Sequence, residues 1–409
     1  MREIDPEALA RDVAALVRVP SLTGDERAAL ECLAGIAERL GLRADLHRHD
    51  LEALRADPRH PGEEAPREEL WGLHIVAPPA APTPRSEPLR VCLNGHVDVV
   101  AAGERPWSRG NAFSGALEDG FVHGRGSADM KGGVVAALHA LAAAADDLLV
   151  EVVLQAVASE EDGGLGTFAA LERDDRFDAA LIPEPTAFDV VCTQAGALTF
   201  TGIVPGVAAH AAVRTEGISA IDRYVEVHRA LQEHERRLNS DVADPLLRDH
   251  PLPYPLSVGR VEAGRWSSTV PDRLEFEGRL GVRVEETVGE ARAAFEAVVR
   301  EACADAEVAW TGGQFAPGST PPDHPFCTLV RDCAAGVLGS APPLTGVSYG
   351  SDLRHFSQRG IPVVMFGPGG LERAHAVDER VSVDDVVAVA RTIARVLVRF
   401  GADYPPQTR

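Results

Sequence analysis

The chain has 409 residues, of which 45% are hydrophobic and 25% charged, and its formal net charge is −22 at pH 7. This composition predicts a soluble globular protein of about two domains, not a disordered chain. The acidic balance argues against nucleic acid as a partner, because neutralising phosphates requires a basic surface. No apolar run approaches the about 20 residues that cross a bilayer, and the start shows no signal peptide, so we expect a cytoplasmic protein without membrane contact.

The first part of the chain alternates helical and strand patterns. Residues 6–42 predict one or two amphipathic helices, and the proline-rich, charged stretch 54–89 predicts a surface loop around one short strand. A helix is predicted over 130–145. Three apolar runs predict strands at 89–100, 149–159 and 179–185. Such alternation favours an α/β fold with a mostly parallel sheet and helices on both faces.

The pattern changes between residues 195 and 309. Strands and helices follow there in the order β-α-β-β-α, at 198–206, 217–238, 255–264, 273–284 and 288–304. This order predicts an inserted two-layer α+β domain. A strand within 361–370 and a helix at 381–400 then return to the first sheet. We therefore predict a discontinuous α/β domain at 1–194 and 310–409, interrupted by a second domain at 195–309.

The strand pattern LNGHVDVV ends in two polar side chains, His96 and Asp98. Side chains alternate along a strand, so both project from one face, where the carboxylate can accept the spare imidazole N–H. In metal sites such a carboxylate orients a ligating histidine. The simpler interpretation is a buried His/Asp pair without metal, and the remaining motifs have to decide between the two.

Further acids and a second histidine stand at the ends of the other predicted strands. They are Asp129, Glu160, Glu161, Glu184 and His375. Ligand groups gather beyond the carboxyl ends of strands in open α/β sheets, so these side chains should converge. Imidazole nitrogen with carboxylate oxygen suits zinc or its neighbours. Three carboxylates and one hydroxide would offset two divalent cations, whereas the acids alone would repel one another.

Five motifs carry a family resemblance: LNGHVDVV, GRGSADMKGG, ASEEDGG, PEPT and AHAVDE. In this order they closely resemble the M20 metallopeptidase and deacylase family over nearly the whole chain. The resemblance implies two Zn²⁺ ions, for which Co²⁺ or Mn²⁺ can substitute. It implies that His96 and Glu184 hold one ion, that Glu161 and His375 hold the other, and that Asp129 bridges both.

The resemblance also implies catalytic roles. Asp98 would support the metal ligand His96, and Glu160 would be the general base that activates the bridging water. The inserted domain would be a lid that forms a homodimer, and its His210, in VPGVAAHAAV, would stabilise the oxyanion in the partner's site. A cis peptide bond is implied after Asp129.

The stretch SYGSDLRHF resembles the family's loop for a substrate carboxylate. It would bind through Arg354 and through backbone N–H groups at Gly350 and Ser351, since arginine suits bidentate carboxylate recognition. The alternative is a surface salt bridge between Arg354 and Asp352.

Other substrate contacts are less fixed by the sequence. Arg279 and Arg283 are candidates for a second contact to the substrate. Where many relatives have an asparagine before VPD, this chain has Ser268, whose shorter side chain argues against transferring acetylornithine or succinyl-diaminopimelate specificity. Trp266 or Arg265 could supply the contact instead.

Our first functional hypothesis is hydrolysis of the amide bond of an N-acyl amino acid. A dipeptidase or carboxypeptidase of the same family is the alternative, and a non-catalytic metal-binding relative is a second one. A dinucleotide site is excluded because GRGSAD has Asp129 where the third glycine is needed. No HExxH motif is present. The six cysteines are scattered without CxxC, which predicts reduced packing residues.

Overall fold

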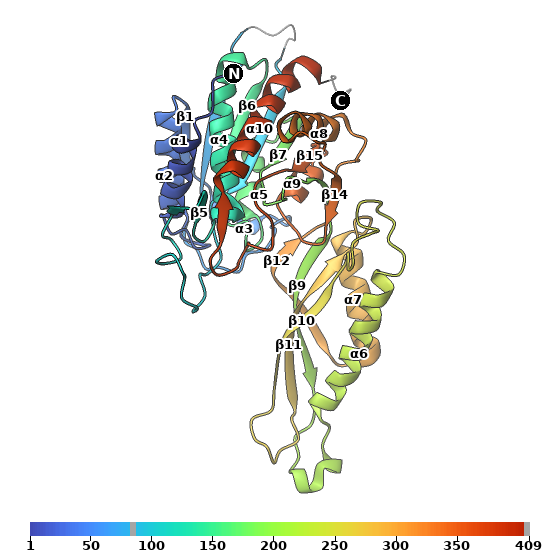
Figure 1. Ribbon diagram of the computed structural model, residues 1–409. Helices are drawn as coiled ribbons and strands as arrows, with labels where there is room; N and C mark the ends of the chain where they lie inside the picture. Colours follow the sequence, from blue (N-terminus) through green and yellow to red (C-terminus); the bar gives the residue numbers. More distant parts are fainter. Residues whose placement is uncertain (82–86, 405–409) are drawn as a thin grey trace. The chain divides into compact units, whose positions relative to one another are not determined.

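The computed structural model describes residues 1–81 and 87–404. The chain divides into two compact units (Figure 1), one made of residues 1–192, 319–345 and those from 355 on, the other of 193–318 and 346–354. The second unit continues past residue 309, where we expected its end, because β12 (Glu307–Phe315) pairs with β9 (Gly196–Pro205). Of the predicted loop 54–89, residues 82–86 lie outside the described part.

A mixed nine-stranded sheet forms the base of the first unit, in the order β1-β2-β6-β3-β7-β15-β8-β13, with β14 paired to β8. Its central strands β6, β3, β7 and β15 run parallel, β1 and β2 are antiparallel to their neighbours, and β8 is antiparallel to β15. The α/β prediction is confirmed. The strands are β1 Arg43–Arg48, β2 Trp71–Ala77, β3 Arg90–His96, β6 Glu151–Val157, β7 Ala179–Ile182, β8 Val190–Gln194, β13 Gly318–Ser319, β14 Leu344–Val347 and β15 Val363–Met365.

Helices cover both faces of this sheet, as two adjacent residues of β3 show. Gly95 faces Val134 of α4 (Gly132–Ala144), whereas Asn94 donates to Thr167 of α5 (Leu165–Arg173). Successive strand residues point to opposite faces, so α4 and α5 lie on opposite sides. Helix α4 is apolar and buried on all sides, as a central helix must be.

Figure 1 shows α10 (Val383–Asp403) running alongside α4, against which it packs. Further helices are α1 Pro6–Val17, α2 Arg27–Arg39, α3 Leu51–Ala56, α8 Pro325–Leu338 and α9 Leu353–Ser357. A separate small sheet has the order β16-β5-β4, with bounds β16 Arg380–Ser382, β5 Phe121–His123 and β4 Ala116–Glu118.

The second unit is a two-layer α+β domain, as predicted. Its antiparallel sheet has the order β10-β11-β9-β12, where β10 is Leu256–Ala263 and β11 is Arg273–Val282. Two helices, α6 (Ala220–Leu238) and α7 (Val288–Ala302), pack on it around a core that includes Phe200, Phe276 and Phe295. The fourth strand, β12, was not predicted from the sequence.

The cysteines and the helices bear on the predictions of reduced thiols and of no membrane span. All six cysteines are free thiols, and every one except Cys32 is buried. Within residues 1–81 and 87–404, none of the helices combines the length and the apolar character needed to cross a membrane.

Candidate metal centre

Two histidines flank one aspartate in the first unit. His96 ends β3, and its Nε2 lies 3.3 Å from Oδ1 of Asp129. Nε2 of His375 lies 3.6 Å from Oδ2 of the same carboxylate. Asp129 therefore stands between the imidazoles with one oxygen turned to each. The peptide bond between Asp129 and Met130 is cis, as the resemblance implied.

Each histidine has a further carboxylate beside it. Oε1 of Glu184 lies 3.8 Å from Nε2 of His96, and Oε2 of Glu161 lies 3.1 Å from Nε2 of His375. Ligand atoms of His96, Asp129 and Glu161 all lie within 4.8 Å of one another. The structure thus gathers the five candidate ligands in two groups that share Asp129.

The acids of this cluster shift the pKa values of their neighbours. The hydrogen bond with Glu161 raises the pKa of His375. Burial alone lowers the pKa of His96, but hydrogen bonds with Asp129 and Asp98 outweigh burial and raise it well above its ordinary value. Burial and the charge of Asp129 raise the pKa of Glu161. The dense negative charge responsible for these shifts equally favours bound cations.

Asp98 connects His96 to the loop of the two glutamates. Nδ1 of His96 donates to the backbone carbonyl of Asp98 at 2.9 Å, and the carboxylate Oδ1 is more distant at 3.5 Å. We expected the carboxylate to be the main acceptor, and this detail is corrected. The carboxylate instead accepts the backbone N–H groups of Glu160 at 3.2 Å and Glu161 at 3.1 Å. Asp98 therefore holds the ring with its backbone carbonyl and, at a longer distance, with its carboxylate, which also fixes the loop.

A buried ion pair behind the centre was missed by the sequence analysis. Oε1 of Glu379 accepts the N–H groups of Ala128 at 2.9 Å and Asp129 at 3.1 Å, and its Oε2 lies 2.7 Å from Nη1 of Arg125. Arg125 also donates to the carbonyl of His375 at 3.0 Å. The pair joins the loop of Asp129 to that of His375. Both residues lie inside recognised motifs, but they are 254 positions apart, so only the fold shows their contact.

His210 and Ser268 lie on neighbouring loops of the second unit. The N–H of Ala211 donates to the carbonyl of Ser268 at 2.9 Å, and His210 forms a β-bridge with Thr269. Both predicted residues are exposed. Nδ1 of His210 accepts the N–H of Ala212 at 3.1 Å, which leaves Nε2 as the ring nitrogen that can donate.

Arg354 is buried within the second unit. Its guanidinium carbon lies 4.1 Å from the ring centre of Phe315, and Nη1 donates to the carbonyl of Ser351 at 2.8 Å. Arg354 and Asp352 are each 1% exposed, so neither lies at the surface, as the salt-bridge alternative assumed. A buried arginine held over an aromatic ring is fixed in position, as recognition of a planar anion requires.

The other predicted substrate contacts share this loop. The N–H of Ser351 donates to the side chain of Gln194 at 3.1 Å, and Gly350 packs directly on Phe315. Arg279 donates to the carbonyl of Ser348 at 3.1 Å, which ties β11 to the loop. Arg283 instead donates to the last carbonyls of α6, so its place as a substrate contact is corrected to a helix C-terminal cap.

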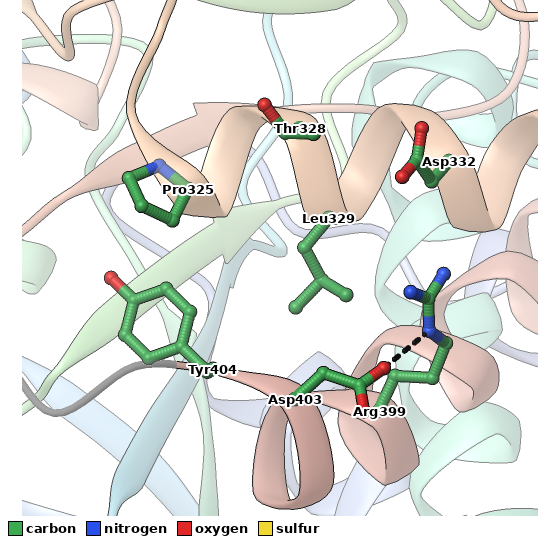
Figure 2. A pocket seen from close by; sticks show the side chains of 7 residues that line it. All are labelled: Pro325, Thr328, Leu329, Asp332, Arg399, Asp403 and Tyr404. Atoms are coloured by element: carbon green, nitrogen blue, oxygen red, sulfur yellow. Dashed lines mark hydrogen bonds and ion pairs between the residues drawn. The ribbon is translucent and has the colours of Figure 1, made fainter.

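A small cavity of about 140 Å³ lies between α8 and α10. Figure 2 shows its lining, in which Nε of Arg399 pairs with Asp403 at 2.9 Å. None of the candidate ligands lines it.

Known proteins similar to this chain include two bacterial enzymes. Succinyl-diaminopimelate desuccinylase of Methylorubrum populi is 30% identical over 98% of this chain and 99% of its own length. N-formyl-4-amino-5-aminomethyl-2-methylpyrimidine deformylase of Bacillus subtilis is 26% identical over 75% of this chain and 78% of its own.

Solved structures share the fold. The protein YXEP of Bacillus subtilis, described as a dinuclear metal-binding peptidase, aligns with a TM-score of 0.65 at 17% identity, covering 97% of this chain and 99% of its own. The sequence pattern of peptidase family M20/M25/M40 matches residues 92–399. These residues include all five candidate ligands and the flanking Glu160 and Glu379, and the protein belongs to this family of hydrolases.

Proposed function

We propose that this protein is a metal-dependent deacylase, which hydrolyses the amide bond of an N-acyl amino acid and releases the free amino acid. Asp129 carries the proposal, because it lies between His96 and His375 with one carboxylate oxygen turned to each imidazole. A carboxylate shared by two sets of donors is the feature expected of a two-metal hydrolytic site.

The donor set fits two zinc ions. Zinc takes histidine nitrogen and carboxylate oxygen at about 2.0–2.2 Å, so two ligand atoms on one tetrahedral ion lie about 3.3 Å apart. The separations of 3.3 Å between His96 and Asp129 and 3.1 Å between His375 and Glu161 agree. We assign His96 and Glu184 to one ion, Glu161 and His375 to the other, and Asp129 to both. Co²⁺ or Mn²⁺ would suit the same donors.

Divalent cations held there would polarise the amide carbonyl and lower the pKa of a water molecule. The chain itself supplies the proton transfers. Glu160 is only 8% exposed, and the bond from its backbone N–H to Asp98 fixes its loop. We assign Glu160 as the general base, which accepts a proton from the attacking water and delivers it to the leaving amine.

The two sequence relatives favour deacylation over peptide cleavage, since their names describe removal of a succinyl and a formyl group. The substrate would present a carboxylate beside the scissile amide. We assign Arg354 and the backbone N–H of Gly350 to that carboxylate, with Arg279 and Ser268 as further contacts. The N–H of Ser351, which we expected to bind it too, already donates to Gln194. The fixed position of Arg354 over Phe315 supports this role.

We also propose that the second unit is a lid and the contact surface of a homodimer. Exposed aliphatic side chains near its His210 are those of Val207, Val213, Ile218, Ile221 and Val225. Monomeric soluble proteins rarely gather such side chains in one region, so a second copy of the chain would cover them. His210 would then donate to the developing oxyanion in the partner's site.

The charge of the chain supports a class of substrate, and its cysteines support a cellular compartment. The acidic composition supports a small-molecule substrate over nucleic acid or a membrane. Six free thiols suit a reducing compartment, and we therefore propose the cytoplasm.

The experiment measures primary amine release from N-acetyl, N-succinyl and N-formyl amino acids and from dipeptides. Chelator-stripped protein is assayed with and without added Zn²⁺ or Co²⁺. We expect metal-dependent turnover of an N-acyl amino acid, lost in Glu160→Gln with metal content unchanged, and retained in the control Glu104→Gln at an exposed position. Turnover of dipeptides alone would identify a dipeptidase. Bound metal without turnover of any amide would contradict the proposal in favour of a non-catalytic relative.

A further inference from the structure

Three more histidines gather at the edge of the large sheet: His47 on β1, His49 just after β1 and His74 on β2. In the antiparallel register Asp45 pairs with His74 and His47 pairs with Gly72. Paired residues share a face, and so do residues two apart, so His47, His49 and His74 project from the same side. The ring centre of His47 lies 4.7 Å from that of His49 and 4.6 Å from that of His74.

One nitrogen of each ring is buried without a partner. Throughout residues 1–81 and 87–404, nothing forms a hydrogen bond with Nε2 of His47, His49 or His74. His74 is only 8% exposed, so water does not readily replace the missing partner. Buried polar atoms are normally paired, and three unpaired nitrogens on neighbouring rings require an explanation.

The tautomer of the central ring suits a metal ligand. Nδ1 of His47 lies 3.0 Å from the backbone carbonyl of Asp45, and a carbonyl can only accept, so Nδ1 carries the proton and Nε2 keeps its lone pair. Ligating histidines commonly donate their second N–H to a backbone carbonyl in this way. Burial lowers the pKa of His49 to about 3 and that of His74 to about 4, so these rings are neutral at neutral pH.

Gly72 leaves the space in which two of these nitrogens meet. A Cβ atom on this residue would lie 2.6 Å from Nε2 of His49 and 3.2 Å from Nε2 of His47. The two nitrogens thus converge above a glycine, at a position that any other side chain would fill. The carboxylate of Asp45 is engaged by Arg173 at 2.8 Å, which leaves the imidazoles as the donors.

We propose that His47, His49 and His74 bind one divalent transition-metal ion through Nε2, in the space left by Gly72. Three imidazoles suit Zn²⁺, Ni²⁺ or Cu²⁺ and not Mg²⁺ or Ca²⁺. Their nitrogens do not all lie within the 4.8 Å that the candidate centre satisfies, so binding requires a rotation of at least one of the three side chains. The bound ion would tie the edge strand β1 to β2. This site is independent of the proposed function.

Nickel titration of the chelator-stripped, full-length protein by calorimetry tests the site. We expect the wild type to bind one equivalent more than Gly72→Ala, which fills the space but keeps every histidine. His49→Gln should weaken that equivalent at least tenfold, whereas His250→Gln on the second unit should not. Asp129→Asn should leave it in place, because this variant acts on the other centre.

Cu²⁺ electron paramagnetic resonance then identifies the donors. Nitrogen hyperfine structure present in Asp129→Asn and absent in Asp129→Asn/Gly72→Ala supports the site. Equal ion numbers and affinities in the wild type and Gly72→Ala would overturn it and leave the cluster as packing alone. Thermal unfolding in chelator shows whether Gly72→Ala folds. If it does not, the nickel affinities of His49→Gln and His250→Gln are compared instead, and equal affinities would overturn the site.

Discussion

Two histidine clusters of the first unit differ in what surrounds the rings. Glu161 raises the pKa of His375, and the acids around His96 outweigh burial to raise its pKa too. Burial instead lowers the pKa of His47, His49 and His74, which have one another as neighbours. The same side chain therefore has different chemistry in the two places, because neighbouring carboxylates outweigh burial in the first cluster, whereas burial outweighs Asp45 in the second.

A buried ion pair also fixes the two loops that carry Asp129 and His375 in the carboxylate-rich cluster. Glu379 accepts two backbone N–H groups of the Asp129 loop and pairs with Arg125, which donates to the loop of His375. Among the described residues, the other cluster has one backbone acceptor for its rings, the carbonyl of Asp45. We therefore expect the first to bind ions more tightly and in a more fixed geometry.

Asp129→Asn should have the largest effect on the carboxylate-rich cluster and none on the cluster of His47, His49 and His74. It removes the negative charge that both imidazoles of the candidate centre share, so kcat/KM should fall by more than the about 100-fold typical of losing a supporting group. Metal analysis by mass spectrometry should show loss of bound zinc. The control is Asp119→Asn, at an exposed position that tolerates asparagine because its φ is 53°. Full zinc content with full activity in Asp129→Asn would contradict the assignment.

His210 belongs to neither cluster. Its replacement tests whether a residue of the second unit acts on the chemical step, measured by kcat, more than on KM. If it donates to the oxyanion, His210→Ala should lower kcat by about 10²–10³-fold with a much smaller change in KM. Sedimentation should show the same oligomer as the wild type. An unchanged kcat in a folded protein would remove His210 from the mechanism.

Glu379→Gln tests the support behind the metal cluster. Loss of its charge weakens the pairing with Arg125 while the shape is kept, so zinc affinity should fall by about 10–100-fold. Competition with a chromogenic chelator measures this, and Glu372→Gln, exposed and close in sequence, is the control. Equal zinc affinity in the wild type and Glu379→Gln would make the ion pair purely structural.

Glu26 tests the effect of burial on an acid that is not a ligand. Burial raises its pKa from 4.5 to about 7, followed by the charge of Asp98, and Arg67 only partly opposes this. The folded protein then holds the proton more tightly than the unfolded chain, so protonated Glu26 adds to the free energy of unfolding. This contribution is fully present below pH 4.5 and is lost as the pH rises through about 7.

Glu26→Gln removes that titration. The free energy of unfolding of the variant, relative to the wild type, should therefore increase from pH 5 to pH 8, by on the order of 2 kcal/mol. Thermal unfolding in chelator at both pH values measures it. Glu31→Gln at an exposed position should show no such trend, and a trend of the opposite sign for Glu26→Gln would refute the assignment.

The sequence predicted the α/β sheet and the residues of the candidate centre because both follow from local patterns. Apolar runs mark the strands, and polar residues directly after them, such as His96 and Glu161, must lie at strand ends. The role of Asp98 was only half predicted, since alternation gives its face but not whether its backbone or side chain meets the ring.

Long-range pairing explains what was missed. Arg125 and Glu379 are 254 positions apart and meet only in the folded chain, and no periodicity links them. The cluster of His47, His49 and His74 depends on the register of β1 against β2, which a long intervening segment leaves open. Strand β12 was missed because we expected the inserted domain to end soon after the helix at 288–304. The pairing of β12 with β9 extends that domain further along the chain.

Anomalous diffraction at the zinc absorption edge, from crystals grown with zinc, tests the central claim most directly. The account predicts two strong peaks on either side of the Asp129 carboxylate, about 3.5–4 Å apart, one near His96 and Glu184 and the other near His375 and Glu161. A single peak there, or zinc bound only away from Asp129, would contradict it.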